Sequence, residues 1–154
     1  LGIGDRHNGN LMMNKNGKFF HIDFGHFLGH KKSVRLGVVN FNRERTPFVC
    51  TPAFCGVIGR EDSPNFKRFT TLCCDAYNVI RHNSGLIISL FELMLATGIP
   101  ELHRDSIKYL QHALSLELSD KQASQKFNNL MVKTIRSYFK LFDDAIRIAS
   151  RLYN

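Results

Sequence analysis

Glycine and proline are distributed very unevenly along this chain. The first half is interrupted by glycines and short runs of β-prone residues, whereas residues 101–154 contain neither glycine nor proline. Both residue types interrupt helices, so the distribution predicts loops and short strands followed by long, uninterrupted helices. At 154 residues, the chain has the size of one ordinary domain or of one lobe of a larger domain. The predicted fold class is α+β and mostly helical.

Several start and stop signals define the helices of the second half. Ser63 followed by Pro64 is typical of a helix start, and Gly-Ile-Pro at residues 98–100 is typical of a helix end. Ser119 and Gln122 have the spacing of a capping box. The predicted helical segments are residues 64 to about 81, 86–96, 105–114, and one or more helices after Ser119.

The last predicted helix has an apolar stripe with basic residues beside it. The stripe consists of Phe127, Leu130, Met131, Ile135, Tyr138, Phe142, Ile146, Ala149 and Leu152. Such a pattern is ordinary for a helix that packs on a core and turns its charged face to solvent. A basic amphipathic helix that lies on a membrane surface has the same pattern, so both interpretations stay open.

Asn16 and Gly17 lie between two short β-prone runs, which is a strong signal for a two-residue hairpin turn of type I′. If these two residues form the turn, Asn10 on the first strand lies opposite Asp23 on the second. Opposed side chains in a hairpin have Cβ atoms about 4.5 to 5.5 Å apart. Residues 25–50 lack sustained periodicity, and we expect a long functional loop there.

The paired hairpin positions suggest a metal site. Carboxylate and amide oxygens are hard ligands of the kind that Mg²⁺ takes, so Asn10 and Asp23 are candidate ligands. Asp5 precedes Asn10 by five residues, as in the H-R-D-x-x-x-x-N catalytic loop, and Asp23-Phe24-Gly25 is a D-F-G tripeptide. Phosphoryl transfer needs metal ions on the nucleotide phosphates and a group that handles the attacking hydroxyl. His7 and His26 each lie near a motif carboxylate and could take part in that proton transfer.

The formal net charge of +8 predicts an anionic partner: nucleic acid, a phospholipid surface or a phosphorylated small molecule. The longest apolar run, residues 86–96, is shorter than the roughly 20 residues that a membrane span needs. Four cysteines, including the adjacent Cys73 and Cys74, fit neither a secreted disulfide framework nor the paired spacing of a zinc site. This favours a cytosolic protein with reduced thiols.

Three stretches of the sequence carry a family resemblance: GIGDRHNGN, FHIDFGHFLG and NRERTPF. Together they resemble the phosphoinositide 3-kinases of the PI3/PI4-kinase family, in particular the class I enzymes. The order D-R-H, in place of H-R-D, separates them from ordinary protein kinases. The resemblance continues through CCDAYNVIRHNSGLIISLFELMLATGIPEL and covers residues 1 to about 116.

The resemblance implies the C-terminal lobe of a PI3/PI4-kinase catalytic domain with a protein-kinase-like fold. Its parts would be a catalytic loop at residues 5–10, an activation segment at 23–48 and a helical part at 64–154. The N-terminal lobe, which would supply the phosphate-covering loop, the nucleotide-binding lysine and the hinge, is absent from the chain. We therefore expect the chain alone to be inactive.

The resemblance also implies roles for individual residues. Asp5 and His7 would be the catalytic-loop pair, Asn10 and Asp23 the magnesium ligands, and His26 a participant in proton transfer. The positions equivalent to Met12 and Ile22 would lie against the adenine ring. Two basic boxes of the activation segment would bind the phosphates of the lipid headgroup: Lys31, Lys32, Arg43 and Arg45.

The implied function is a lipid kinase that transfers the ATP γ-phosphate to the 3-hydroxyl of phosphatidylinositol lipids, phosphatidylinositol 4,5-bisphosphate in particular. Mg²⁺ would be the cofactor, and the partners would be ATP, a phosphoinositide at a membrane surface and a regulatory subunit, without nucleic acid. We expect a cytoplasmic protein that is recruited to the cytosolic face of membranes such as the plasma membrane.

Two other functions are compatible with parts of the sequence. A phosphoinositide 3-kinase-related Ser/Thr protein kinase shares the motif order, but a protein substrate does not require the two basic boxes. A non-catalytic module that binds lipid or nucleic acid would use the net charge, but it would not need both metal ligands.

Overall fold

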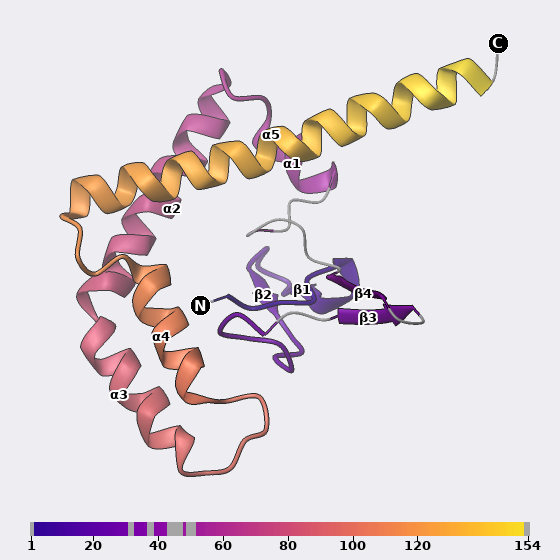
Figure 1. Ribbon diagram of the computed structural model, residues 1–154. Coiled ribbons are helices and arrows are strands. Elements are labelled where there is room, and N and C mark those ends of the chain that lie inside the picture. The colour runs from indigo at the N-terminus through magenta and orange to yellow at the C-terminus, as the bar shows by residue number, and fades with distance from the viewer. Residues whose placement is uncertain (1, 31–32, 37–38, 43–47, 49–51, 153–154) are drawn as a thin grey trace.

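The chain folds into two small β-hairpins beside a set of α-helices (Figure 1). The computed structural model describes residues 2–30, 33–36, 39–42, 48 and 52–152. Its elements are a short 3-10 helix η1 (Asn8–Asn10), strands β1 (Leu11–Met13), β2 (Phe19–His21), β3 (Ser33–Leu36) and β4 (Val39–Asn42), and helices α1 (Pro52–Ile58), α2 (Pro64–His82), α3 (Ser84–Leu95), α4 (Arg104–Leu114) and α5 (Asp120–Leu152). The α+β, mostly helical class predicted from the sequence is confirmed.

The helix signals in the sequence correspond to hydrogen bonds in the structure. Ser63 caps α2, and its hydroxyl accepts a hydrogen bond from the main-chain N–H of Phe66 at 3.1 Å. Ser119 and Gln122 form the expected reciprocal pair at the start of α5, because each side chain accepts from the other residue's main-chain N–H. Everything after Ser119 up to residue 152 is a single helix.

The first hairpin differs from the prediction by one position in register. Leu11 pairs with His21 and Met13 with Phe19, so the loop between Asn14 and Lys18 has three residues instead of two. The main-chain N–H of Gly17 donates to the carbonyl of Asn14 at 3.0 Å, and Gly17 has a φ of 75°. A type I turn followed by a residue with positive φ is the usual three-residue solution. The predicted two-residue turn was therefore wrong.

The region predicted as one long loop contains a second hairpin. Strands β3 and β4 pair antiparallel, with Ser33 opposite Asn42 and Leu36 opposite Val39. The sequence signal was weak because each strand has only four residues. Helix α1 was missed for a similar reason, since a seven-residue helix is too short for periodicity to be read.

Two apolar clusters hold the helices together. Leu28, Tyr77, Leu102, Leu110, Leu114 and Ala123 form the larger one, and Cys55, Ile58, Phe66 and Ile135 form the smaller. Helix α3 contributes partly buried side chains such as Phe91 to the larger cluster, whereas its Leu86, Leu90 and Leu93 are exposed. Within the described residues, no helix is both long and apolar enough to cross a bilayer.

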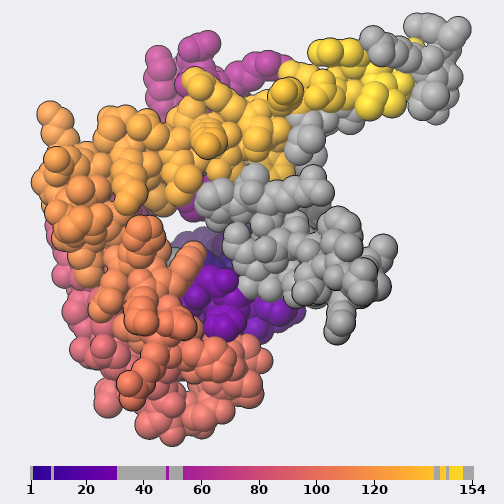
Figure 2. All heavy atoms as spheres, in the orientation of Figure 1, coloured from indigo at the N-terminus to yellow at the C-terminus, as the bar shows by residue number. Residues whose placement is uncertain are grey.

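The buried residues of the apolar stripe lie in the first half of α5, although Leu130 there is 39% exposed. Met131 and Ile135 are core residues, whereas Ile146 is 53% exposed and Ala149 is also exposed. The C-terminal end of α5 extends beyond the other helices, so nothing described covers this end (Figures 1 and 2). The stripe therefore packs on a core, as predicted, only in the half of α5 that contacts α1 and α2.

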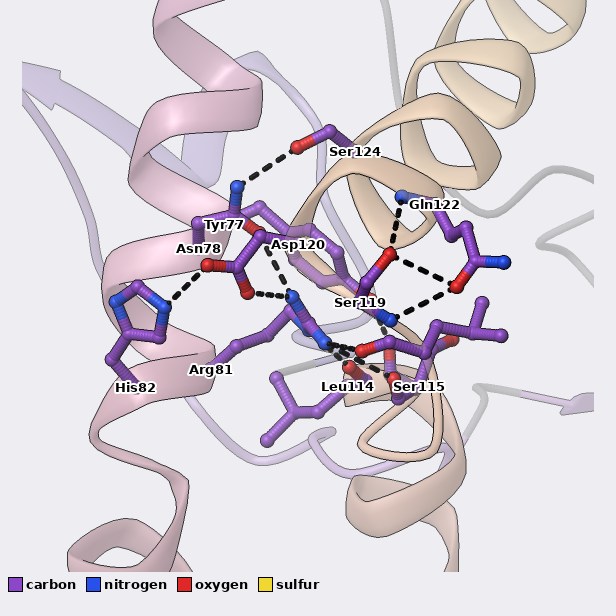
Figure 3. Close-up of polar contacts among 12 residues, drawn as sticks. Tyr77, Asn78, Arg81, His82, Leu114, Ser115, Ser119, Asp120, Gln122 and Ser124 are labelled. Atoms are coloured by element: carbon purple, nitrogen blue, oxygen red, sulfur yellow. Dashed lines mark hydrogen bonds and ion pairs between the residues drawn. The ribbon is translucent and has the colours of Figure 1, made fainter.

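Arg81 ties α2 to the turn between α4 and α5 (Figure 3). The buried guanidinium donates to the carbonyls of Leu114 at 2.9 Å, Ser115 at 3.3 Å and Leu118 at 2.5 Å. It also pairs with the carboxylate of Asp120 at 2.6 Å. On the exposed side, a hydrogen bond from His82 is the main cause that lowers the pKa of Asp120. One side chain thus donates to three main-chain carbonyls of this turn, of which that of Ser115 also accepts from the N–H of Leu118 at 3.1 Å.

Helix α4 supports the N-terminal segment through Tyr109. Gly2 and Gly29 both have positive φ, and a Cβ built at either would lie less than 3.0 Å from the Tyr109 side chain. In Figure 2, purple atoms of the N-terminal segment lie against orange atoms of α4. The main chain can approach the ring this closely only where it lacks a side chain.

Replacing Arg81 with methionine should lower the free energy of unfolding of the chain by about 2–4 kcal/mol, because the carbonyls of Leu114 and Leu118 lose this donor. Urea unfolding would measure the change. His82→Ala is the matched control, since it removes only the exposed partner of Asp120 and should have a much smaller effect. Equal losses in the two variants would contradict the role assigned to Arg81.

Gly17 and Gly29 both have positive φ, and the stability cost of alanine at each can be compared. Gly17→Ala should cost about 1 kcal/mol, because only the backbone conformation is strained and no atom lies within 4 Å of the added Cβ. Gly29→Ala should cost about 2–4 kcal/mol, because Tyr109 must also move. Thermal unfolding of both variants would test this, and similar costs would show that Tyr109 does not constrain the segment.

Candidate active site

Two segments of main chain lie side by side at the start of the first hairpin. They are residues 4–10, which lead into β1, and residues 22–26, which follow β2. The N–H of Ile22 donates to the carbonyl of Asn10 at 3.1 Å, and the N–H of Gly4 donates to the carbonyl of His26 at 2.7 Å. The candidate catalytic residues Asp5, His7, Asn10, Asp23 and His26 therefore all belong to one hydrogen-bonded unit.

Arg6 joins the same two segments through its side chain. Nε donates to the carbonyl of Gly4 at 2.7 Å, and Nη1 donates to the carbonyls of Ile22 at 2.8 Å and Asn10 at 3.4 Å. Nη2 donates to the carbonyl of Asp23. The guanidinium also lies over the ring of Phe24, 6.0 Å from its centroid. Its contacts are thus with the main chain and one aromatic ring.

Asp5 and Asp23 both have backbones that side-chain-bearing residues seldom adopt. Their φ angles are 52° and 62°. A residue other than glycine in this region costs of order 1–3 kcal/mol, and such residues cluster at active sites. The carbonyl of Asp23 accepts a hydrogen bond from Arg6, and that of Asp5 accepts one from the Asn10 side chain. These hydrogen bonds hold both residues in the strained conformation.

Asn10 and Asp23 have the chemistry of magnesium ligands. The Nδ2 group of the buried Asn10 donates to the carbonyl of Asp5 at 2.9 Å, which fixes the amide and directs its Oδ1 elsewhere. Asp23 is exposed, and only its Oδ1 accepts a described hydrogen bond, from the N–H of Gly25 at 3.3 Å. The described residues contain no group of three or more His, Cys, Asp or Glu around a common point. One carboxylate and one amide oxygen fit an ion whose other ligands are substrate phosphates.

The register of the hairpin corrects the predicted geometry of this pair. Asn10 lies opposite Ile22, and Asp23 is one residue further along the chain. The two candidate ligands are neighbours across the junction, but they are not directly opposed. The positive φ of Asp23 marks the point where the chain turns away from the hairpin.

His7 has one ring nitrogen already bonded. Its Nδ1 accepts a hydrogen bond from the N–H of Gly9 at 3.1 Å and caps η1. In the neutral ring the proton is then on Nε2, so the exposed side chain presents an N–H donor. His7 can take a proton from a hydroxyl only at Nδ1, after it releases Gly9.

Met12 and Ile22 lie on one face of the first hairpin, together with Phe20. Met12 pairs with Phe20, and Ile22 follows Phe20 by two positions, so the alternation of a strand brings all three to the same side. Met12 is 48% exposed and Phe20 46% exposed, whereas Ile22 is half-buried. This open apolar face has the character that an adenine ring requires.

The predicted headgroup residues, Lys31, Lys32, Arg43 and Arg45, lie outside the described residues. The segment just before them is anchored on α4. Nε2 of His30 lies 3.3 Å from Oγ of Ser106, and the His30 ring lies 5.5 Å from that of His103.

Arg6 is the residue that sequence reasoning missed. No role of its own was predicted for Arg6 from the sequence, and no spacing rule distinguishes an arginine that binds carbonyls from one that binds phosphate. Its place between Asp5 and His7 was the one available signal.

A cavity of about 510 Å³ lies elsewhere, between residues 60–62 and α5. Its walls carry both signs of charge. Arg136 forms two hydrogen bonds of 2.7 Å with Glu61, which lower the pKa of Glu61, and Arg60 lies 3.3 Å from Asp143. These pairs fasten α5 to the start of α2 and leave little net charge for a ligand.

Comparison with known proteins agrees with the motifs. Residues 1–104 match the family model described as phosphatidylinositol 3- and 4-kinase. Phosphatidylinositol 3-kinase 2 of Dictyostelium discoideum is 48% identical over 145 residues, which is 94% of this chain and 8% of that protein. Phosphatidylinositol 3-kinase 1 of the same organism is 51% identical over 136 residues, or 88% of this chain and 8% of that protein.

A more distant relative is the phosphatidylinositol 4-phosphate 3-kinase C2 domain-containing subunit alpha of Pongo abelii. It is 39% identical over 155 residues, which is 99% of this chain and 9% of that protein. The chain spans less than a tenth of the length of these curated relatives. On the family match and these identities, the chain belongs to the phosphatidylinositol 3- and 4-kinase family.

Proposed function

We propose that this chain forms the catalytic-loop part of a phosphatidylinositol 3-kinase. The enzyme would transfer the γ-phosphate of ATP to the 3-hydroxyl of a phosphatidylinositol lipid. The observation that carries the proposal is the hydrogen-bonded junction of residues 4–10 with residues 22–26, which brings Asn10 beside the Asp23 segment. The names of relatives that are 48% and 51% identical support the same activity.

Asn10 and Asp23 are the proposed holders of Mg²⁺. Bound there, the ion would neutralise charge on the β- and γ-phosphates, which is where phosphoryl transfer needs it. Asn10 contributes an amide oxygen whose direction is fixed by the bond from its Nδ2 to Asp5. Asp23 contributes an exposed carboxylate that can reach the phosphates from the open side.

Asp5, His7 and His26 are the proposed residues for the attacking hydroxyl. In the described geometry His7 offers Nε2–H, which suits a hydrogen bond to a phosphate oxygen. The proposed acceptor of the hydroxyl proton is then Asp5. His7 would accept it at Nδ1 only after the hydrogen bond from the N–H of Gly9 is broken. The half-buried His26, whose carbonyl binds Gly4, lies on the second segment of the same junction.

ATP would place its adenine ring on the apolar face formed by Met12 and Ile22. The other wall of the nucleotide site is proposed to come from an N-terminal lobe, so the 154 residues alone should not turn over Mg-ATP. The same proposal includes a regulatory subunit as partner. It also includes a cytoplasmic location, with recruitment to the cytosolic face of membranes such as the plasma membrane.

The proposed lipid is phosphatidylinositol 4,5-bisphosphate. Its two monoesters carry about −3 to −4 charge units near neutral pH if each carries −1.5 to −2. Lys31 and Lys32 follow Asp23 by eight and nine residues and are the first choice for these phosphates, and Arg43 and Arg45 are the second. Phosphatidylinositol 4-phosphate is a second candidate, because one relative is named for that substrate.

The activity is testable with the full-length protein, Mg-ATP, and vesicles that contain phosphatidylinositol, its 4-phosphate or its 4,5-bisphosphate, beside a mixture of protein substrates. The expected product is lipid phosphorylated at the 3-hydroxyl. Asp23→Asn should abolish it with the fold intact, because the amide keeps the hydrogen bond from Gly25 but lacks the charge that holds the ion. Asp75→Asn, an exposed change on α2, should leave activity unchanged.

Two outcomes would reject the assignment. Phosphorylation of protein alone would favour the related Ser/Thr protein kinases. Full lipid kinase activity in Asp23→Asn, with circular dichroism like that of the wild type, would remove Asp23 from the metal site.

Lipid selectivity should depend on the first basic box. Replacing both Lys31 and Lys32 with alanine should lower kcat/KM for the 4,5-bisphosphate by one to several orders of magnitude, since charge-assisted contacts contribute roughly 1.5–3 kcal/mol each. Activity on unsubstituted phosphatidylinositol should be largely retained. Lys121→Ala with Lys133→Ala, both exposed on α5, is the control for lost net charge. An equal loss on both lipids would mean that these lysines bind membrane or fold, and do not read the headgroup.

A further inference from the structure

The side chain of Arg6 is almost fully used by main-chain carbonyls. A guanidinium has five N–H donors in a rigid plane. Nε donates to the carbonyl of Gly4, Nη1 to those of Ile22 and Asn10, and Nη2 to that of Asp23. Four of the five N–H groups therefore have carbonyl partners. One N–H group remains, which is too few for the two-pronged contact by which arginine binds phosphate.

Two of these four carbonyls belong to the residues of the proposed metal site. Asn10 and Asp23 both bond to the same guanidinium through their own carbonyl oxygens. Gly4 and Ile22 extend the contact to both segments. A planar group that bonds both backbones at once sets the distance and orientation of one relative to the other.

We propose that Arg6 is a positioning residue that holds the main chains of Asn10 and Asp23 in a fixed relation, and that it does not bind the transferred phosphate. The proposal rests on the proposed phosphotransferase function for the identity of the ligand, but the clamp itself is a property of the free protein.

The junction has other bonds, so a change at Arg6 should loosen it without unfolding the chain. The Gly4 to His26 and Ile22 to Asn10 main-chain bonds do not involve the guanidinium. The segment also rests on α4, through Tyr109 beneath Gly29 and through Ser106 beside His30. The expected defect is local, at residues 22–26.

Arg6→Lys separates shape from charge in the full-length protein. The lysine keeps the positive charge but cannot reach carbonyls of both segments in one plane. The Mg²⁺ concentration for half-maximal lipid phosphorylation should rise about tenfold or more, as for other groups that orient ligands. The KM for lipid should change little. Arg68→Lys, at an exposed site on α2, is the matched control and should behave like the wild type.

Hydrogen–deuterium exchange of the protein without metal or nucleotide provides a readout that does not require activity. Amides of residues 22–26 should exchange faster in Arg6→Lys than in the wild type, while those of α4 and α5 stay unchanged. Faster local exchange in Arg6→Lys than in the wild type would support the clamp, and it would still do so if the wild-type protein had no lipid kinase activity, a result that would reject the proposed function. Unchanged exchange and an unchanged Mg²⁺ requirement in an active enzyme would overturn the clamp.

If the lysine variant is unfolded by circular dichroism, Arg6→Ala with added small cations decides the question. Guanidinium ions should restore slow exchange of residues 22–26 and a low Mg²⁺ requirement, whereas ammonium ions should not. Equal restoration by both ions, or by neither, would show that the planar fork is not what Arg6 contributes.

Discussion

The buried guanidinium of Arg81 is the contact on which the arrangement of the helices depends. It reaches from α2 into the turn between α4 and α5 and donates to the carbonyls of Leu114, Ser115 and Leu118, of which that of Ser115 also accepts from the N–H of Leu118. This fixes where α4 ends and where α5 begins. Tyr77, one turn earlier on α2, adds a hydrogen bond to the carbonyl of Ala113 at 2.8 Å and stacks on Phe127 of α5 at 4.2 Å. The position of α4 then determines that of the candidate site, because the N-terminal segment rests on α4.

Two arginines thus serve the same physical purpose at two levels of the structure. Arg81, on α2, holds the end of α4 and the turn after it by their main chain, and Arg6 holds two loop segments by theirs. A backbone that turns sharply exposes carbonyls that helices and strands would otherwise satisfy. A guanidinium can serve several of them at once because its donors are fixed in one plane. Part of the excess positive charge of the chain is therefore used internally.

Local signals predicted more of this structure than long-range ones did. The caps at Ser63 and Ser119 were recognisable because a cap depends on residues within one turn. The hairpin register was wrong because Asn-Gly suits both a two-residue turn and the end of a three-residue loop. That choice is made by Asn14, whose Oδ1 accepts from the N–H groups of Asn16 at 3.0 Å and Lys18 at 2.9 Å. The structure brings the segments of the sequence-predicted residues together at the junction, but Arg6 was missed because its partners are backbone atoms, which every sequence has.

The contact of Tyr109 with Gly2 and Gly29 couples three positions that are distant in the sequence, because the residue tolerated at each depends on the other two. Gly2 and Gly29 lie 27 residues apart in the chain, and each would place an added Cβ against the same side chain. Neither glycine can become larger while the ring stays, and a smaller residue at position 109 would leave a gap beneath both segments. In a redesigned version of this protein, the three identities would have to be chosen jointly. A change that looks conservative at any one of them would alter the chain just before the first segment of the candidate site and just after the second.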